Sequence, residues 1–256
     1  MIFLMGGTSE TGPLAGSLAD RGYRVIVSTA TDAPLDVGGH PNIRRRIGRL
    51  GEEGLCALFR EHAVRAAVDA AHPYAAEAHA AIRQAARRIN IPCFRLDRPG
   101  VVEEGEGIVF ATDHDEAARL AFSFGTPVLL TTGSRNLAPY VRESRRVGAP
   151  LAARVLPQPE SLDACRAAGV PDDRIIAARG PFSVEENRAA IRRFGVGVVV
   201  TKDSGEAGGS AAKVQAAREE KCQLVVVRRP QICCANTFDS IEGLMQAIST
   251  KIPVRR

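Results

Sequence analysis

The chain has 256 residues, of which 45% are apolar and 25% are charged, a composition typical of a folded globular protein. No apolar run approaches the roughly 20 residues that span a bilayer, and the first apolar segment is too short for a signal peptide. We therefore expect a cytoplasmic protein without a membrane partner. The length accommodates two lobes of about a hundred residues each.

The net charge is +5, from 34 basic and 29 acidic side chains, and arginine dominates the basic residues. Arginines cluster at residues 44–49, 228–229 and 255–256. Guanidinium groups bind carboxylates and phosphates through paired hydrogen bonds. Because no aromatic residues are interleaved with these clusters and no nucleic-acid recognition motif occurs, we expect a small anionic ligand and no nucleic-acid partner. The sequence makes no prediction of oligomeric state.

The chain has six cysteines, without a C-x-x-C pair and without a histidine at metal-ligand spacing. Most lie on apolar faces, where a free thiol acts as a small apolar side chain. We therefore expect no metal site. The adjacent pair Cys233-Cys234 has no functional explanation in the sequence.

The first predicted element is a buried strand at residues 2–4, followed by a glycine turn at residues 6–10 and an amphipathic helix. Glycines allow the backbone to approach a phosphate, and the helix N-terminus offers N–H groups and the positive end of the helix dipole. We expect Thr8 or Ser9 to cap this helix. The P-loop Lys-Ser/Thr pair and strict G-x-G-x-x-G spacing are absent, which leaves a looser dinucleotide-type turn. In such a turn Glu10 binds a ribose hydroxyl or the helix N-terminus.

The second predicted strand, residues 23–28, ends in the hydroxyl side chains Ser28 and Thr29, and Asp32 comes later. A carboxylate at this strand tip favours NAD because it binds the ribose 2′-hydroxyl. Hydroxyls with an arginine from residues 44–46 nearby accept a 2′-phosphate instead. We therefore expect NADPH, with NADH as the alternative.

The remaining elements of the first lobe alternate between strands and helices. They are strands at residues 42–47, 66–70 and 91–96, a helix at residues 52–62, and an alanine-rich helix that ends at residue 88 with Pro73 at its start. The sequence at residues 97–100 breaks this pattern, and the acidic, glycine-rich residues 101–107 are expected to link two lobes. The predicted division is residues 1–100, a dinucleotide-binding lobe, and residues 101–256, a C-terminal α/β lobe.

The second lobe repeats the alternation. Its predicted strands are residues 127–131, 151–155, 174–177, 196–201 and 223–227, and its predicted helices are residues 136–143, 160–168, 184–194, 210–221 and 237–248, with a further helix opening at residue 112. Alternating strands and helices predict an α/β fold of two Rossmann-like lobes with mostly parallel sheets. Nearly every polar cluster follows a strand, and ligands bind beyond the carboxyl ends of such strands. We expect the two edges to face a central cleft.

Six of these clusters carry a joint pattern. They are residues 6–10, 69–75, 95–99, 132–136, 180–187 and 201–213. In their order and spacing they resemble the precorrin-6A reductase family of cobalamin biosynthesis, with its cobalt-precorrin-6A relatives, over nearly the whole chain. Two departures stand out: Thr11-Gly12-Pro13 replaces a more helix-friendly sequence, and Ala212 stands where the family tends to carry Glu before the lysine.

The resemblance implies that a reduced nicotinamide delivers hydride to a ring double bond of a carboxylate-rich, tetrapyrrole-derived macrocycle, and that a proton is added at the neighbouring carbon. The hydride chemistry belongs to the cofactor, while the protein supplies orientation and electrostatics. Whether the macrocycle contains cobalt is left open by the sequence.

Site residues follow from the strand-end positions together with the resemblance. Cofactor contacts are expected at Gly6, Gly7, Thr8, Ser9, Glu10, Ser28 and Thr29. Substrate contacts are expected at Arg135, Arg179, Lys202, Ser204, Gly205, Gly208 and Gly209. Candidate catalytic residues are Lys202, His72 and Tyr74, with two alternatives: Lys202 binds only a substrate carboxylate, and His72 only orders the turn at Pro73. Asn136 and Ser183 are expected to be helix caps. No role is assigned to His40, His62, His79 or His114.

Two rival functions were compared with the reductase. An alcohol dehydrogenase of the short-chain type needs Tyr and Lys four residues apart, and none of the three tyrosines has a lysine at that spacing. A sensor with two α/β lobes that binds NADPH without turnover is the remaining alternative. Oxidation of the nicotinamide in the presence of the macrocycle distinguishes an enzyme from a sensor.

Overall fold

The computed structural model describes residues 1–32, 35–97, 100–205, 208–230 and 234–254. The chain divides into two compact units, one formed by Met1–Pro99 with Pro230–Arg256 and the other by Gly100–Arg229. The first boundary lies where the sequence predicts it. The prediction was wrong for the C-terminal segment, which we assigned to the second lobe and which belongs to the first unit. The cleft expected between the lobes stays a prediction.

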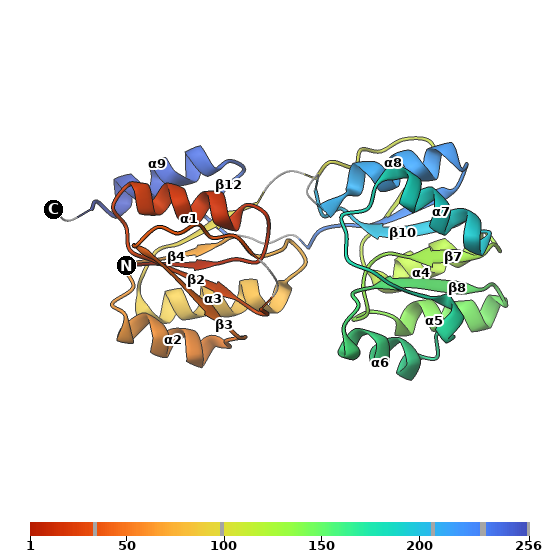
Figure 1. The fold of residues 1–256 in the computed structure, drawn as a ribbon, viewed down its shortest axis with the longest axis horizontal. Coiled ribbons are helices and arrows are strands. Elements are labelled where there is room, and N and C mark those ends of the chain that lie inside the picture. The colour runs from red at the N-terminus through yellow and green to blue at the C-terminus, as the bar shows by residue number, and fades with distance from the viewer. Residues whose placement is uncertain (33–34, 98–99, 206–207, 231–233, 255–256) are drawn as a thin grey trace. The chain divides into compact units, whose positions relative to one another are not determined.

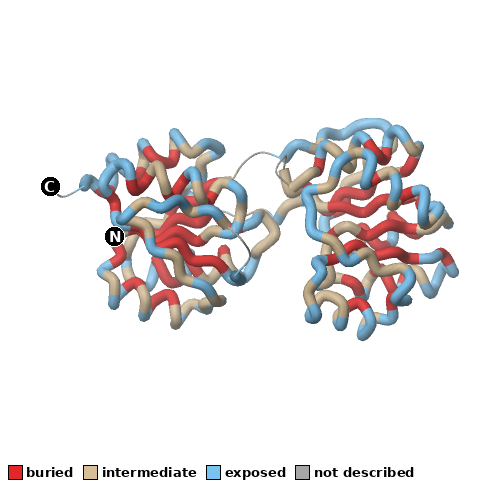
Figure 2. Tube along the Cα trace, in the orientation of Figure 1, coloured by how far each residue is buried: buried red, intermediate tan, exposed pale blue. Residues whose placement is uncertain are grey.

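The first unit is built on a six-stranded sheet in which every neighbouring pair of strands is parallel. In spatial order the strands are β12 (Thr237–Phe238), β5 (Cys93–Leu96), β4 (Ala66–Asp69), β1 (Ile2–Met5), β2 (Val25–Thr29) and β3 (Ile43–Ile47). The central strands are apolar along their whole length and buried on both faces, as parallel strands require. Figure 2 shows these strands as the buried centre of the unit.

Helices cover both faces of this sheet (Figure 1). One face carries α1 (Thr11–Asp20) and α9 (Ile241–Lys251), and the other carries α2 (Glu52–Glu61) and α3 (Ala76–Ile89). Leu14 of α1 and Leu244 of α9 belong to the same buried cluster. The C-terminal helix is therefore part of the first unit's core.

The second unit repeats this architecture with its own six-stranded parallel sheet. The strands in spatial order are β6 (Ile108–Ala111), β11 (Gln223–Val227), β10 (Val198–Lys202), β7 (Val128–Leu130), β8 (Leu151–Val155) and β9 (Ile175–Ala177). The helices are α4 (His114–Ser123), α5 (Ala138–Val147), α6 (Pro159–Ala168), α7 (Val184–Phe194) and α8 (Ser210–Glu219), with a 3-10 turn at Asp172–Arg174. In Figure 1, α7 and α8 lie on one face of the sheet, and α5 and α6 lie on the other.

The two parallel sheets with covering helices confirm the predicted α/β class. Two elements differ from the prediction. Strand β6 was not predicted, because its four residues follow directly on the acidic segment that we interpreted as a linker. The helix expected at residues 237–248 is the short strand β12 followed by α9, and β12 pairs with β5 through Thr237 and Phe238.

Helix caps were predicted with mixed success. Ser183 forms the predicted capping box of α7. Its side chain accepts a hydrogen bond from the Glu186 N–H, and the Glu186 carboxylate accepts one from the Ser183 N–H. Asn136 is not a cap, since α5 begins after Leu137. Pro73 does not start α3, whose N-cap is Ala75.

Within the described parts of the chain, no helix is both long and apolar enough to cross a membrane. Segments of the sequence prediction also fall outside the described residues. They are Arg98-Pro99, Glu206-Ala207, Cys233 and Arg255-Arg256.

Replacing Leu244 with alanine tests whether the C-terminal helix stabilises the first unit. Leu244 is fully buried, so Leu244→Ala should lower the free energy of unfolding of this unit by about 2–5 kcal/mol, measured by urea denaturation. Gln246→Ala, at an exposed position of the same helix, is the control and should leave the midpoint nearly unchanged. Equal midpoints for both variants and the unchanged protein would contradict this assignment.

Candidate active site

Parallel pairing places the carboxyl ends of all strands of a sheet at one edge. In the first unit this edge carries the glycine turn after β1, the hydroxyls at the end of β2, and the turn after β4. In the second unit it carries the residues that follow β6, β7, β8, β9 and β10.

The glycine turn is closed by the residue that begins α1. Thr11 Oγ1 accepts hydrogen bonds from the N–H groups of Gly7 (3.0 Å) and Thr8 (3.2 Å). The expected N-caps were wrong, because the N-cap is Glu10, while the Thr8 hydroxyl donates to the carbonyl of Ala70 (3.1 Å). Thr11 thus occupies two amides that we expected to face a phosphate, and the turn is tied to the segment after β4.

Gly7 remains the point of closest access in this turn. Its φ of +120° lies in the region that favours glycine, and a Cβ built there meets no described atom within 4 Å. Gly6 and Gly12 are different, since a Cβ at Gly6 would collide with Thr11 and one at Gly12 with the carbonyl of Asp36. Only Gly7 leaves open space for a ligand, while the other two glycines are needed for packing.

The expected hydroxyl and guanidinium groups lie together at the ends of β2 and β3. The sheet register pairs Ser28 with Arg46, and Arg46 Nη1 donates to Ser28 Oγ at 2.8 Å. Arg45 Nη2 donates to Thr29 Oγ1 at 3.3 Å and lies 4.0 Å from the exposed carboxylate of Asp32. Each hydroxyl at this strand end is therefore paired with one guanidinium group, and because adjacent strand residues point to opposite faces, the two pairs lie on opposite faces of the sheet.

His72 and Tyr74 lie in the turn between β4 and α3. Their ring centroids are 5.7 Å apart, and the Tyr74 N–H donates to His72 Nδ1 at 3.3 Å. His72 is exposed and Tyr74 is half-buried. The structure therefore brings these two candidate catalytic residues together, in a turn whose Ala70 carbonyl is bound by Thr8 of the glycine turn.

The edge of the second unit gathers positive charge around Lys202, the last residue of β10. Burial lowers the pKa of Lys202, and the neighbouring Arg135 lowers it further. Burial, with Lys202 next in effect, lowers the pKa of His114 to about 4, and His114 Nδ1 lies 2.8 Å from the Tyr140 hydroxyl. His114 is thus neutral at pH 7. No role was assigned to His114 from the sequence.

Two further cations, the buried Arg154 and the half-buried Lys213, were given no role in the sequence prediction. Arg154 of β8 stacks over the Phe182 ring at 4.0 Å and donates to Asn187 Oδ1 at 2.7 Å, and burial lowers its pKa to about 10. Burial and then Arg154 lower the pKa of Lys213 in α8 to about 8, and its ammonium donates to the Gly208 carbonyl at 3.0 Å. The available signal was an arginine inside the otherwise apolar strand Leu151–Val155.

The loop after Lys202 is bonded internally. The Ser204 N–H donates to Ser210 Oγ (3.1 Å), and the Gly205 N–H donates to Asp203 Oδ1 (3.2 Å). The Gly208 N–H donates to the Gly205 carbonyl at 3.2 Å. The amides of Ser204, Gly205 and Gly208, which we expected to cradle an anion, thus have partners in the loop or at Ser210, and Gly209 is the N-cap of α8.

Arg179 and Arg135 are both exposed residues in strand-end loops of this unit. Arg179 directly precedes the cis Gly180–Pro181 bond after β9, and Arg135 follows β7. Both therefore lie at the predicted edge, and Arg135 is close enough to Lys202 to affect its pKa.

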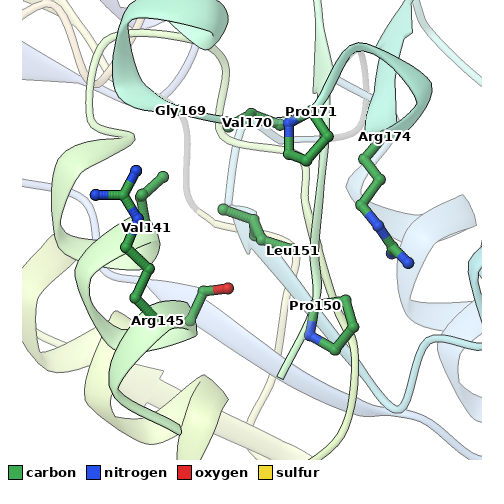
Figure 3. A pocket seen from close by; sticks show the side chains of 9 residues that line it. Val141, Arg145, Pro150, Leu151, Gly169, Val170, Pro171 and Arg174 are labelled. Carbon is green, nitrogen blue, oxygen red and sulfur yellow. The ribbon is translucent and has the colours of Figure 1, made fainter. Parts of the chain in front are cut away.

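A cavity of about 280 Å³ in the second unit lies away from this edge, at the beginning of β8. Figure 3 shows Arg145 and Arg174 on either side of Leu151, without convergence of their guanidinium groups on a common point. Since its position and charges differ from those of the strand-end clusters, the cavity is not part of the candidate active site.

Comparisons with known proteins agree on one family. Residues 1–249 match the family model described as "Precorrin-6x reductase CbiJ/CobK". The chain is 33% identical to the cobalt-precorrin-6A reductase of Priestia megaterium over 249 residues, which covers 97% of this chain and 98% of the relative. It is 34% identical to the precorrin-6A reductase of Rhodococcus erythropolis over 256 residues, with 97% of each covered.

A solved structure titled "CobK precorrin-6A reductase" has the same fold. It is 26% identical and covers 100% of this chain and 98% of its own, with a TM-score of 0.80. These similarities confirm the family resemblance noted in the sequence. The alternative of a sensor without turnover receives no support from them.

The low pKa of Lys213 can be measured directly. In protein whose lysines carry ¹³C-methyl labels, the Lys213 signal, identified by its loss in Lys213→Arg, should titrate near pH 8. Because Arg154 contributes to this lowering, Arg154→Met should raise the midpoint, whereas Arg145→Met, at the remote cavity, should not. A midpoint at the ordinary lysine value would contradict the burial of this ammonium.

Proposed function

Because the chain belongs to the precorrin-6x reductase family CbiJ/CobK, a family of oxidoreductases of cobalamin biosynthesis that act on a carbon–carbon double bond, we propose that it reduces a ring double bond of a precorrin-6A-type macrocycle with NADPH. The match over residues 1–249 is the observation that carries this proposal. The polar strand ends of the two units supply residues suited to the two ligands.

The first unit holds the cofactor in this proposal. The turn at Gly6, Gly7, Thr8, Ser9 and Glu10 approaches the pyrophosphate, and the open space beside Gly7 fits that role. Ser28 and Thr29, with Arg45 and Arg46, bind the adenosine end. A guanidinium group at this strand end favours a 2′-phosphate, since it forms charge-assisted hydrogen bonds with phosphate oxygens. The cofactor is therefore NADPH rather than NADH.

The second unit holds the carboxylates of the macrocycle. The contact surface consists of Arg135, Arg179 and Lys202 and the loop of Ser204, Gly205, Gly208 and Gly209. The cations Arg154 and Lys213 extend this surface. Buried cations are costly without a counter-charge, so a carboxylate-rich ligand relieves an unfavourable arrangement.

When bound, the nicotinamide supplies a hydride to one ring carbon. A proton is then required at the neighbouring carbon, and Lys202 is its source in this proposal. Burial and Arg135 lower the pKa of Lys202, so its ammonium releases a proton more readily than an exposed lysine. His72 and Tyr74 contact the nicotinamide side of the site, at the turn that Thr8 ties to the glycine turn.

Turnover is the test of the proposal. Purified protein with NADPH and precorrin-6A, or its cobalt-containing form, should lose nicotinamide absorbance in proportion to the macrocycle reduced. NADPH binding without oxidation in the presence of either macrocycle would support the sensor and contradict the reductase.

Two substitutions of Lys202 separate proton donation from carboxylate binding. Lys202→Arg keeps the charge but holds its proton too tightly to donate it, so kcat should fall about 10²-fold or more, as it should for Lys202→Met. Steady-state kinetics with both substrates measures the effect. If Lys202→Arg kept full kcat and only Lys202→Met raised KM for the macrocycle, Lys202 would be a carboxylate ligand and not the proton donor.

Arg46 is expected to determine the choice of cofactor. Arg46→Ala should weaken NADPH binding roughly tenfold to a hundredfold and leave NADH binding nearly unchanged, because only the 2′-phosphate needs the guanidinium. Binding is followed by nicotinamide fluorescence. Arg44→Ala, an exposed arginine of the same strand, is the matched control. Equal losses for the two cofactors would contradict the assignment.

A further inference from the structure

A buried charged network lies beneath the turn that carries His72 and Tyr74. It consists of Asp69 at the end of β4, His79 in α3 and Arg95 in β5, which are 3%, 2% and 1% exposed. The sequence analysis gave His79 no role, since it appeared only as one histidine on an alanine-rich helix.

The three side chains are in close contact. His79 Nδ1 lies 2.7 Å from Asp69 Oδ2 and 2.7 Å from Arg95 Nη1, and Arg95 Nη1 donates to Asp69 Oδ2 at 3.1 Å. Arg95 Nε also donates to Asp97 Oδ2 at 3.4 Å. Asp69, His79 and Arg95 are thus each held in the interior by at least two polar contacts.

The other ring nitrogen of His79 faces the turn. His79 Nε2 lies 3.0 Å from the carbonyl oxygen of His72. A carbonyl oxygen only accepts hydrogen bonds, so Nε2 carries a proton and donates it to this bond. Arg95 Nη1 also lies 3.3 Å from Nε2, so it is the shorter contact to the carbonyl oxygen that assigns the proton to Nε2.

The turn is therefore fixed at several points. The His72 carbonyl accepts from His79 and also from the N–H of Ala75 at 2.8 Å. Asp69 Oδ1 accepts from the Ala71 N–H at 3.2 Å, and the Thr8 hydroxyl binds the Ala70 carbonyl. The network thus holds the backbone on which His72 and Tyr74 stand, next to the glycine turn.

A charged network of this kind is a poor way to stabilise a fold. Replacing buried ion pairs by apolar side chains of similar volume is often neutral or stabilising, whereas a charged network fixes one geometry of the groups it binds. Here the groups it binds are the backbone atoms of the turn that carries two candidate catalytic residues.

We propose that His79 is a positioning residue, which holds the turn at His72 and Tyr74 against the glycine turn through its Nε2–H bond to the His72 carbonyl and is oriented by Asp69 and Arg95. This inference rests on the proposed function for the identity of the ligand at the turn. The bond orders the turn before the nicotinamide binds, so its loss weakens cofactor binding and turnover without affecting contacts to the macrocycle.

Two amide substitutions in the full-length protein separate positioning from mere burial. The amide nitrogen of His79→Gln reaches the place of Nε2 and keeps the donor to His72, while that of His79→Asn reaches only the place of Nδ1. Hydrogen exchange of a peptide spanning residues 70–76, measured by mass spectrometry, should be about tenfold faster in His79→Asn, the equivalent of one hydrogen bond, and near the original rate in His79→Gln.

Ligand measurements accompany the exchange experiment. We expect His79→Asn to weaken NADPH binding and lower kcat about tenfold, with KM for the macrocycle unchanged, and His79→Gln to restore both. Urea midpoints should be similar for the two variants. Unchanged exchange in His79→Asn, or equal defects in both variants with equal losses of stability, would overturn the positioning role. Absence of turnover in the unsubstituted protein would overturn the proposed function instead, and the exchange rates would still decide the role of His79.

Discussion

Parallel strand pairing is the constraint on which both units depend. Because all strands of each sheet run in one direction, residues far apart in the sequence reach the same edge. Ser28 and Arg46 meet because β2 and β3 pair in that register, and Asp69 meets Arg95 because β4 pairs with β5 in the same way. The polar clusters thus become sites only through the sheet.

Positively charged side chains at the edge of the second unit are partly removed from water, which makes their charged forms less stable. Burial lowers the pKa of Lys202, Lys213 and Arg154, and in the first two a neighbouring arginine lowers it further. Each shift means that the charged form is less stable here than in water. A polyanionic ligand reverses this penalty, whereas an uncharged ligand does not. The arrangement is therefore consistent with the carboxylate-rich substrate that we propose from the family.

The sequence predicted the fold class and most elements, because apolar runs of four to five residues bounded by turns identify buried parallel strands. It did not predict that β12 joins the first sheet. A strand of two residues has no pattern of its own, and its pairing depends on where the chain returns after the second unit. Local pattern, periodicity and composition do not report which sheet a segment joins.

Candidate site residues were found where they stand at strand ends, and residues whose partners come from different elements were missed. Ser28, Thr29 and Lys202 stand at strand ends, so position alone made them candidates. His79 lies within a helix, and its partners are 10 and 16 residues away in two different strands, so only the register reveals it. Thr11 was missed for another reason. A threonine in the first helical turn has ordinary sequence properties, and its capture of the Gly7 and Thr8 amides is visible only in the geometry.

Asp203, in the loop after Lys202, connects this loop to both ends of the second unit. Its carboxylate accepts from the N–H groups of Val101 and Val102 (3.3 Å each), and Arg229 Nε donates to its carbonyl at 2.7 Å. A Cβ at Gly100 would collide with this carboxylate, which explains a glycine at the start of the unit. The residue after Lys202 thus fixes the places where the chain enters and leaves the unit. A substitution of Asp203 would change structure and site together, so Lys202, whose backbone is held by β10, is the position at which chemistry can be separated from folding.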